Sequence, residues 1–367
     1  MEATGEIKLS RRKLRSISSD GVKTAKAVNL VYVTDKDAGI TRKRTSDGFS
    51  YYHKGREVRK EETLFRIRSL VLPPAWEQVW ICASANGHLQ ATGIDARGRK
   101  QYKYHPLWNN LRNQTKFFHL HDFGAALPGL RSQLQKHLAK QGLPLEKVLA
   151  TVVSLMECTC IRIGNSAYEK LYGSFGLTTL KDQHVTIKGH EVKFSFKGKK
   201  GVSHNISLRS RRLARIVKQC RDIPGKELFQ YYDDNGQRKT IDSGMVNNYI
   251  KEISGGNFTA KDFRTWWGSL YALQALKELG EATTETAAKR NIAAALDSVA
   301  RQLGNTRTVC KKYYVHPHIL DLYSAHSLGK YFRKSDQYEC GSQVGLSVEE
   351  QVLMNILERS GSASIAA

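Results

Sequence analysis

The hydrophobic period of this chain changes near residue 127, and this change limits its fold more than any other feature. Between residues 29 and 106, short apolar runs are separated by the turn signals Asp47-Gly48, Lys54-Gly55, Asn86-Gly87 and Arg97-Gly98. Such a pattern is typical of short antiparallel strands. Later apolar residues recur at helical spacing, first at Leu127, Leu130, Leu134 and Leu138. We therefore expect an α+β fold with a small β-rich N-terminal domain and a larger, mainly α-helical domain.

Five segments are expected, since 367 residues exceed what one hydrophobic core usually holds. They are a basic flexible arm at 1–28, a β-rich domain at 29–106, a linker at 107–126, a helical domain at 127–335 and a tail at 336–367. The β-rich domain should begin with a strand at 30–33 and contain one short helix near 61–70. The tail should carry one amphipathic helix, because Ser347 and Glu350 form a capping box before an apolar face.

Residues 184–208 interrupt the helical domain with a period of two. Val192, Phe194 and Phe196 fall on one face, and tight turns are expected at 189–190 and 198–201. This alternation predicts a three-stranded antiparallel sheet with Lys199 at a hairpin tip. Helices are expected before and after this sheet in the sequence. They lie near 145–155, 165–172 and 210–220, from 243, from about 260 to 280 and at 285–303.

The charge of the chain favours a polyanionic partner. It carries 58 Lys and Arg against 34 Asp and Glu, a net charge of +24 that is spread along its length. A dispersed excess of this size suits nucleic acid better than a small acidic ligand. No membrane partner is expected, because the sequence has neither a run of 18 apolar residues nor a basic helix with a bulky apolar face.

Motifs for cofactors are missing from the sequence. The six cysteines lack the paired spacing of a zinc site, and there is no GxxxxGK[ST] loop for ATP. The N-terminus also lacks the apolar core of a signal peptide. We therefore expect reduced thiols, a cytoplasmic location and no cofactor, neither ATP nor an obligatory metal.

Residues 303–317 contain the adjacent tyrosines Tyr313 and Tyr314 among several cations. Gly304 should cap the preceding helix and Pro317 should end the stretch, so a short helix is expected between them. A phenol has a pKa of about 10 and needs positive charge or hydrogen-bond donors nearby to attack at neutral pH. The stretch is therefore a candidate nucleophile site, and a buried tyrosine pair on a basic helix is the alternative.

Candidate donors are scattered along the chain. Arg162 follows a helix, Lys199 occupies the hairpin tip, and Arg264 lies near the start of a helix; each alone also suits a structural role. A further basic segment, residues 97–106, interleaves cations with aromatic residues and an amide. That mixture suits phosphate contacts with stacking or base-edge hydrogen bonds, and an exposed basic hairpin without special role is the alternative.

Taken in order, these residues resemble the type IB DNA topoisomerases, most closely the compact bacterial and poxvirus branch. The resemblance covers about residues 30–335 and rests on the segments 161–165, 198–204 and 259–265, on Gly304-Asn305 and Tyr314, and on Gln101-Tyr102-Lys103-Tyr104. It implies the tyrosine recombinase and topoisomerase IB catalytic fold for residues 127–335. The implied catalytic residues are Tyr314, Arg162, Lys199, Arg264 and Asn305, and the implied DNA contacts are Arg99, Lys100, Gln101, Tyr102, Tyr104, Lys261 and His204.

Two of these positions follow from comparison with the family pattern. Many members carry His where this chain has Asn305, an uncharged donor that can bind a phosphate oxygen but cannot share a proton at neutral pH. Family spacing puts the nucleophile nine positions after that residue, which selects Tyr314 over Tyr313. Because neighbours on a helix point about 100° apart, only one of the two can face the site.

The resemblance implies an isomerase that relaxes positive and negative supercoils of double-stranded DNA. One strand would be cut through a 3′-phosphotyrosyl intermediate, rotated and religated without ATP or metal. A monomer that clamps the duplex in a bacterial nucleoid is expected. Two alternatives are a tyrosine recombinase, against which the β-rich first domain and Lys261 speak, and a non-enzymatic basic DNA-binding protein.

Overall fold

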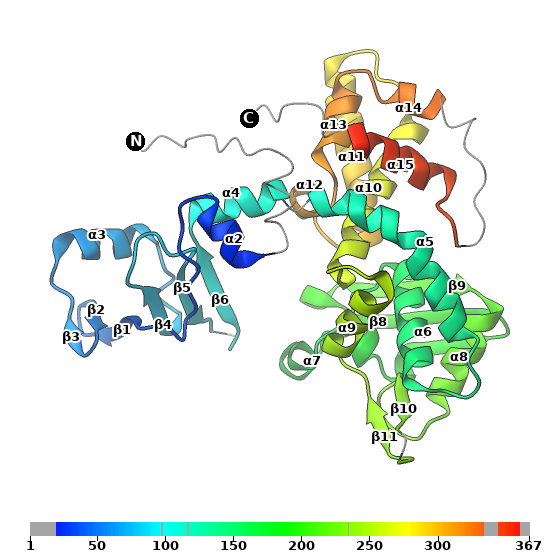
Figure 1. Cartoon of the computed structure of the whole chain (residues 1–367), viewed down its shortest axis with the longest axis horizontal. Helices are drawn as coiled ribbons and strands as arrows, with labels where there is room; N and C mark the ends of the chain where they lie inside the picture. The colour runs from blue at the N-terminus through cyan, green and yellow to red at the C-terminus, as the bar shows by residue number, and fades with distance from the viewer. Residues whose placement is uncertain (1–19, 97, 116, 234, 334–343, 360–367) are drawn as a thin grey trace. The chain divides into compact units, whose positions relative to one another are not determined.

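Strands predominate as far as Tyr104 and helices from Pro106 onward, so the secondary structure changes before the period of the sequence does, near residue 127 (Figure 1). The computed structural model describes residues 20–333 and 344–359, except 97, 116 and 234. Contacts between Cα atoms divide the chain into unit 1, Met1–His119, and unit 2, Leu120–Ile365. Unit 1 contains the largest sheet and unit 2 most of the helices, so the predicted α+β class is confirmed.

Unit 1 contains a six-stranded antiparallel sheet in the order β3-β2-β1-β4-β5-β6. Helix α3 (Glu61–Ser69) covers one face, where its Ile67 packs with Ile40, Val79, Ile81 and Ala91. The strands are β1 (Gly39–Thr45), β2 (Gly48–His53), β3 (Arg56–Glu57), β4 (Glu77–Cys82), β5 (Leu89–Ile94) and β6 (Lys100–Tyr104). Gly48 and Gly55 turn the first hairpins with φ of +139° and +79°, which few other residues tolerate.

The flexible arm expected at 1–28 is wrong for its last residues, which form a helix and pack in a second hydrophobic cluster of unit 1. Helix α2 (Gly21–Lys26) lies within residues 1–28, and Asp20 caps it by accepting hydrogen bonds from two backbone N–H groups. Ala25 is fully buried against Leu30, Trp108 and Leu111, so the end of the expected arm packs into unit 1. Residues 1–19 of the arm lie outside the described residues. The strand expected at 30–33 is also wrong, because only a single bridge from Val31 to Gly87 forms.

The linker expected at 107–126 is helical. It falls in α4 (Pro106–Thr115) and in the beginning of α5 (Phe118–Leu138). Its apolar residues explain the difference: Trp108 and Leu111 are buried within unit 1, and Leu120 and Phe123 are buried within unit 2. Phe123 packs edge-on against Phe263 with ring centroids 4.9 Å apart.

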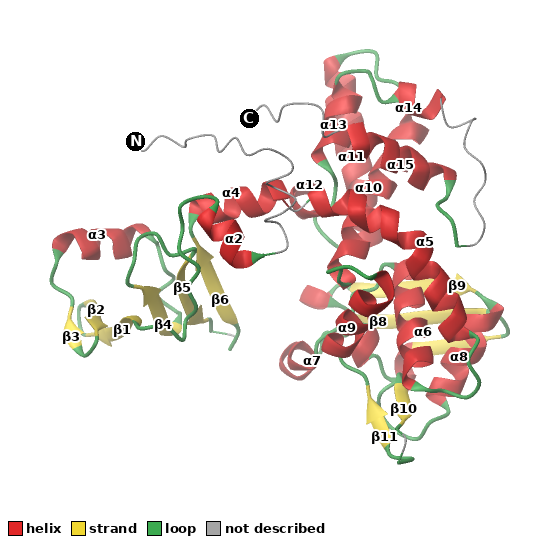
Figure 2. Ribbon diagram, viewed as in Figure 1, coloured by secondary structure: helices red, strands yellow, loops and turns green. Residues whose placement is uncertain are grey.

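In the first part of unit 2, helices pack on one face of a small sheet (Figure 2). Strands β7 (Val185–Lys188), β8 (Glu191–Lys197) and β9 (Ser203–Arg209) form the predicted three-stranded antiparallel sheet. Its buried row is Val192, Phe194 and Phe196. The helices of this part are α6 (Leu145–Thr159), α7 (Ser166–Tyr172), α8 (Arg211–Arg221) and α9 (Ser243–Ser254), with the 3-10 turns η1 (Leu177–Thr179), η2 (Asp182–His184) and η3 (Lys199–Gly201). The hairpin of β10 (Gln230–Tyr232) and β11 (Arg238–Thr240) was not expected.

The second part of unit 2 is built around α10 (Ala260–Leu279). This helix buries Trp266 completely and packs against α11 (Glu285–Leu303), α13 (Pro317–Ser324) and α15 (Val348–Arg359). Helices α12 (Arg307–Tyr313) and α14 (Gly329–Arg333) complete it. Pro317 ends the stretch 303–317 as expected and also begins α13, since its fixed φ suits the first helical position.

Helix α15 belongs to the core of unit 2 and is no separate tail. Glu350 is 2% exposed and accepts hydrogen bonds from Arg131 at 2.7 and 2.9 Å and from the Trp266 indole at 3.0 Å. Arg131 also donates to Glu157 at 2.7 Å. We call Arg131, Glu157 and Glu350 the Arg131 cluster. It joins α5, α6 and α15, so the amphipathic helix expected in the tail is present and fixed to the core.

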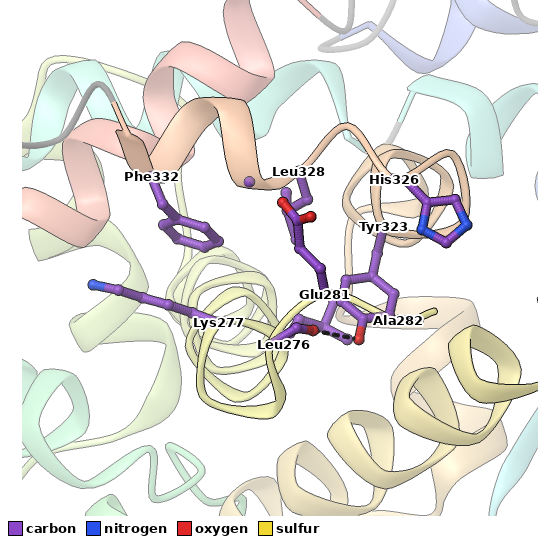
Figure 3. Close-up of a pocket in the computed structure, with 10 residues that line it drawn as sticks. Leu276, Lys277, Glu281, Ala282, Tyr323, His326, Leu328 and Phe332 are labelled. Carbon is purple, nitrogen blue, oxygen red and sulfur yellow. Dashed lines mark hydrogen bonds between the residues drawn. The ribbon is translucent and has the colours of Figure 1, made fainter. Parts of the chain in front are cut away.

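A small pocket of about 70 Å³ opens where α10 ends beside α13 and α14 (Figure 3). Leu276, Leu328 and Phe332 line it, and Tyr323 closes one side by donating to the Gly280 carbonyl at 2.7 Å. No helix among the described residues has both the length and the apolar character needed to cross a membrane.

Candidate active site

Arg162 lies in the loop that follows α6. Cys160 ends that helix in the left-handed conformation, with φ of +55°, and turns the chain into the loop. Backbone hydrogen bonds from Leu177 to the Arg162 carbonyl and from Thr178 to the Ile163 carbonyl, at 2.9 and 2.7 Å, fix the loop against η1. The guanidinium donates to the Gly304 carbonyl at 3.1 Å and to Asn305 Oδ1 at 2.8 Å. Arg162 is thereby held beside the end of α11.

Arg264 lies in the first turns of α10 and is 5% exposed. It donates through Nη1 to the Cys160 carbonyl at 2.5 Å and through Nη2 to the Leu303 carbonyl at 2.7 Å. Both carbonyls belong to helix ends, where backbone oxygens lack intrahelical partners. Its buried Nε has no hydrogen-bond partner among the described residues. Arg264 therefore joins the ends of α6 and α11, and one of its nitrogens, Nε, stays without a partner among the described residues.

Tyr314 follows α12 as its C-cap residue. Ser269 on α10 fixes the backbone there: its hydroxyl donates to the Tyr314 carbonyl at 3.3 Å and accepts from the His316 N–H at 3.0 Å. Gly268 permits this approach, because a Cβ at that position would lie 2.6 Å from the Tyr314 carbonyl oxygen. The Arg264 guanidinium carbon is 5.2 Å from the centre of the Tyr314 ring.

One pocket of about 290 Å³ is lined by Tyr314, Arg162, Arg264 and Lys199 together. Lys199 comes from η3 at the tip of the β8–β9 hairpin and is exposed, as the sequence predicts. Lys261, from the first turn of α10, lines the same pocket. Of the two adjacent tyrosines, Tyr314 lines this pocket, while Tyr313 is 38% exposed and lies beneath the Lys312 ammonium.

Asn305 adjoins this pocket through Arg162, to which its Oδ1 is bound. Its Nδ2 is buried without a partner among the described residues. Buried donors are normally satisfied, so an unpaired amide N–H and an unpaired guanidinium N–H suit an acceptor that arrives with a ligand. The arrangement offers N–H donors to an oxyanion.

The electrostatics of the pocket are those of an anion site. Neither Arg162 nor Arg264 has a carboxylate partner in the part of the chain that the structure describes. Burial and then the positive charge of Arg264 lower the pKa of Arg162 to about 10. Two neighbouring cations without a counterion would be stabilised by a bound phosphate.

His204, on β9, lies near the pocket without being one of its lining residues. Its ring stacks on Phe196 with centroids 5.1 Å apart. Burial, and next the charges of Arg162 and Arg264, lower the pKa of His204, which keeps the ring uncharged at neutral pH.

The remaining sequence candidates belong to unit 1, on and just before β6. Gln101 Nε2 and Arg99 Nε both donate to Asp95 Oδ2, at 2.9 and 2.7 Å, and Lys100 forms an ion pair with Asp35. The side chain of Tyr102 is 50% exposed, whereas that of Tyr104 is more deeply buried.

The two tyrosine rings stack with centroids 6.0 Å apart, and Tyr104 continues the stack onto Trp108 at 6.4 Å. Burial raises the pKa of Tyr104. The segment thus presents one open aromatic ring, supported from below, and cations and an amide that acidic residues hold in place.

Several residues of these sites had no signal in the sequence. Asp35 and Asp95 orient the cations and amide of β6, and Ser269 and Gly268 position Tyr314. The pocket is also lined by Asn165, Tyr168, Ser174 and Phe175. Groups of three or more His, Cys, Asp or Glu side chains that could hold a metal ion do not occur among the described residues.

The fold and the site together define a class of enzyme whose helical domain gathers Arg, Lys, Arg and Tyr around a cationic pocket. Type IB topoisomerases and tyrosine recombinases both belong to that class, because both use the same combination of Arg, Lys, Arg and Tyr. The family described as "Eukaryotic DNA topoisomerase I, catalytic core" matches residues 104–336, and the family described as "Bacterial DNA topoisomerase IB, N-terminal domain" matches residues 48–95.

Individual relatives agree with these families. The chain is 34% identical over 296 residues to "DNA topoisomerase 1B" of Acanthamoeba polyphaga mimivirus, covering 78% of this chain and 87% of the relative. It is 25% identical over 254 residues to "DNA topoisomerase 1B" of Vaccinia virus (strain Copenhagen), covering 67% and 76%. The chain belongs to the type IB DNA topoisomerase family.

Proposed function

We propose that this protein is a type IB DNA topoisomerase that relaxes positive and negative supercoils. The single observation that carries the proposal is the pocket in which Tyr314 meets Arg162, Arg264 and Lys199, beside unpaired donors of Arg264 and Asn305. A tyrosine surrounded by cations without counterions suits attack on a phosphodiester. Membership of the type IB family supports the same reaction.

Tyr314 is the proposed nucleophile. Its phenolate oxygen forms a bond to a backbone phosphorus, and the bond from that phosphorus to the 5′ oxygen breaks, leaving a 3′-phosphotyrosyl ester. Arg162, Arg264 and Asn305 donate to the nonbridging oxygens and stabilise the charge that grows on them in the transition state. Two such planar guanidinium groups suit a phosphate better than ammonium groups would.

Lys199 is the proposed general acid. An alkoxide is a poor leaving group, so the 5′ oxygen needs a proton as its bond to phosphorus breaks. Lys199 lies at an exposed hairpin tip that lines the same pocket and can deliver a proton there. Rotation of the free 5′ end then releases superhelical strain, and attack of the 5′ hydroxyl on the phosphotyrosyl ester restores the strand.

We propose that the enzyme works as a monomer on double-stranded DNA, with both units contacting the duplex, and without ATP or an obligatory metal. The net charge of +24 and the aromatic and basic residues of β6 support the DNA contacts. The phosphotyrosyl ester conserves the free energy of the broken phosphodiester, so religation needs no other energy source. We also propose a location with the chromosome in a bacterial cytoplasm, which the match to the bacterial N-terminal domain family supports.

The test is relaxation of plasmid DNA in EDTA without ATP, by the unchanged chain and by Tyr314→Phe. The unchanged chain should relax both signs of supercoil, and Tyr314→Phe should be inactive because the attacking oxygen is missing. Tyr313→Phe is the matched control, since it removes a neighbouring hydroxyl that lies outside the pocket.

The pattern of results separates the competing classes. Relaxation together with site-specific strand exchange would favour a tyrosine recombinase. Binding without relaxation, and without capture of the protein on DNA under denaturing conditions, would favour an architectural DNA-binding protein and contradict the proposal.

Salt dependence tests the DNA contacts separately. A chain that neutralises six to ten phosphates should lose about 10³- to 10⁵-fold in affinity between 50 and 200 mM salt. Affinity that does not change with salt would contradict binding across the duplex.

A further inference from the structure

The imidazole of His204 lies between two glycines that each precede a residue of the active site. A Cβ on Gly198, just before Lys199, would lie 2.6 Å from both Cδ2 and Nε2 of His204. A Cβ on Gly304, just before Asn305, would lie 2.6 Å from Cε1 and 3.2 Å from Nε2. The same corner of the ring therefore contacts the hairpin of the proposed acid and the end of α11.

The ring has little freedom to move out of this position. His204 pairs with Phe196 across β8 and β9, and the two rings stack at an interplanar angle of 23°. Phe196 is buried, so the sheet holds the ring by this stacking contact. A displacement of the ring would require a shift of the hairpin or of Gly304.

On the hairpin side, the contact lies at Gly198, directly before Lys199. The tip is closed by a hydrogen bond from the Gly198 N–H to the Val202 carbonyl at 2.7 Å, and Lys200 adopts φ of +65°. Lys199 is exposed, and the ring of His204, on strand β9 of the same hairpin, lies against the tip at Gly198. The contact at Gly198 is one residue away from the lysine.

The other side of the contact belongs to the phosphate-binding residues. The Gly304 carbonyl accepts from Arg162 Nη2, and the next side chain, Asn305, accepts from the same nitrogen. Two features favour glycine at position 304. Its φ is +57°, and the imidazole of His204 occupies the space that a Cβ would need.

We propose that His204 is a positioning residue that sets the place of the Lys199 hairpin against the Arg162–Asn305 pair. This inference rests on the proposed function. It gives His204 a role inside the protein, in addition to the DNA contact expected from the sequence. Because the ring is uncharged at neutral pH, it spaces the two groups without adding a third cation beside Arg162 and Arg264.

The test compares single-turnover cleavage of two short duplexes, one ordinary and one with sulfur in place of the bridging 5′ oxygen. A thiol has a pKa of about 8.5 and leaves as a thiolate, so the sulfur duplex does not need a general acid. On ordinary DNA, His204→Ala should cleave roughly 10²-fold more slowly, because misplacing a catalytic group by about 1 Å has effects of that size. On the sulfur duplex the loss should disappear, as it should for Lys199→Ala.

A size exchange provides a second variant that leaves the imidazole in the protein. Gly198→Ala has an extended backbone that alanine tolerates, with φ of −91°, but its Cβ would meet the ring. Gly198→Ala should slow cleavage of ordinary DNA. In a protein that already carries His204→Ala, adding Gly198→Ala should cause no further slowing, because the ring that its Cβ would meet is gone. His190→Ala is the matched control, since His190 is an exposed histidine at the opposite turn of the same sheet.

Three outcomes would overturn the inference. One is unchanged cleavage of ordinary DNA by His204→Ala, and another is an equal loss on both duplexes, which would mean that the histidine does not act through Lys199. The third is a loss in Gly198→Ala that persists when His204 is removed. Failure of the unchanged chain to cleave either duplex would instead contradict the proposed function itself.

Discussion

Unit 2 buries arginines in two places, and only one of these places contains carboxylates. In the Arg131 cluster, Glu157 and Glu350 accept three hydrogen bonds from one guanidinium at 2.7 to 2.9 Å. At the active site, Arg162 and Arg264 donate only to carbonyl oxygens and to one amide oxygen. The same residue type thus occurs once with its countercharge and once without it.

The pKa of the arginine that has carboxylate partners is raised, and the pKa of Arg162, which has none among the described residues, is lowered. Burial lowers the pKa of Arg131, but hydrogen bonds and charge from Glu350 and Glu157 outweigh it, and the pKa is raised. For Arg162, burial and then Arg264 act in the same direction and lower the pKa to about 10. A paired arginine ties structural elements together, whereas unpaired arginines leave a positive site that a phosphate can fill.

The largest effect is expected from Arg162→Gln, which should slow DNA relaxation by about 10³-fold because a donor to the transition-state oxyanion is lost. Stability should not fall, since a pKa lowered by folding means that the charged guanidinium disfavours the folded state at neutral pH. Relaxation assays and thermal unfolding of the same preparation measure both quantities. A large drop in the unfolding temperature would contradict the distinction between the two regions.

The opposite result is expected from Arg131→Gln. Two buried carboxylates would lose their cation, which should lower the free energy of unfolding by about 3–5 kcal/mol. The relaxation rate of the molecules that remain folded should stay near that of the unchanged chain. Urea unfolding and active-site titration give the two numbers.

Lys140→Gln is the matched control for that variant, because it breaks the exposed ion pair with Glu146 at 3.4 Å. Such pairs contribute about 0–1 kcal/mol. Equal losses in the two variants would mean that burial does not distinguish them.

A smaller effect should follow from Trp266→Phe. This change keeps an aromatic ring in α10 but removes the indole N–H that donates to Glu350 at 3.0 Å, and the smaller ring fills less of the buried site. A hydrogen bond to a charged group contributes about 1.5–3 kcal/mol, and we expect the free energy of unfolding to fall by at least that amount. Since Trp266 is two residues from Arg264, a loss of activity beyond the loss of stability would mean that the two regions are coupled through α10.

The sequence predicts the elements that carry the active site because their signals are local. Period-two residues specify the β7–β8–β9 sheet, and cap residues specify both ends of α11, where Thr284 and Gly304 lie. The hairpin position of Lys199 follows from the same local signals. Elements whose cues are local can be predicted from one sequence.

Other elements are missed where tertiary contacts decide. Helix α2 has only six residues and is held by Trp108, more than 80 positions away in the sequence. Strand β11 consists of Arg238, Lys239 and Thr240, all exposed, and lacks any apolar alternation. Burial of Glu350 depends on Arg131, which the capping box does not reveal.

The candidate site shows the same limit at atomic scale. Family spacing selects Tyr314, but Ser269, which holds its backbone, lies 45 positions earlier. The carbonyl groups that bind Arg264 lie 104 and 39 positions away. Backbone acceptors carry no residue identity, so no pattern of letters could indicate them.

The smallest effect distinguishes the two regions by pH. His204 lies at the active site with a lowered pKa, so below about pH 6.5 the unfolded chain binds a proton that the folded chain does not. The free energy of unfolding should therefore fall as the pH drops from 7.5 to 5.5. In the Arg131 cluster, the lowered pKa of Glu350 preserves its contribution until the pH falls below 4.5, and the raised pKa of Glu157 acts in the opposite sense.

Urea unfolding of His204→Gln between pH 7.5 and 5.5 measures the active-site share. Its stability should decline less steeply than that of the unchanged chain, by at most about 1.4 kcal/mol, the value of one pKa unit. Some decline should remain, because burial lowers the pKa of His88, His184 and His318 as well. An unaltered slope would mean that the pKa of His204 is the same in the folded and the unfolded chain, and that the active site accepts a protonated histidine beside two arginines.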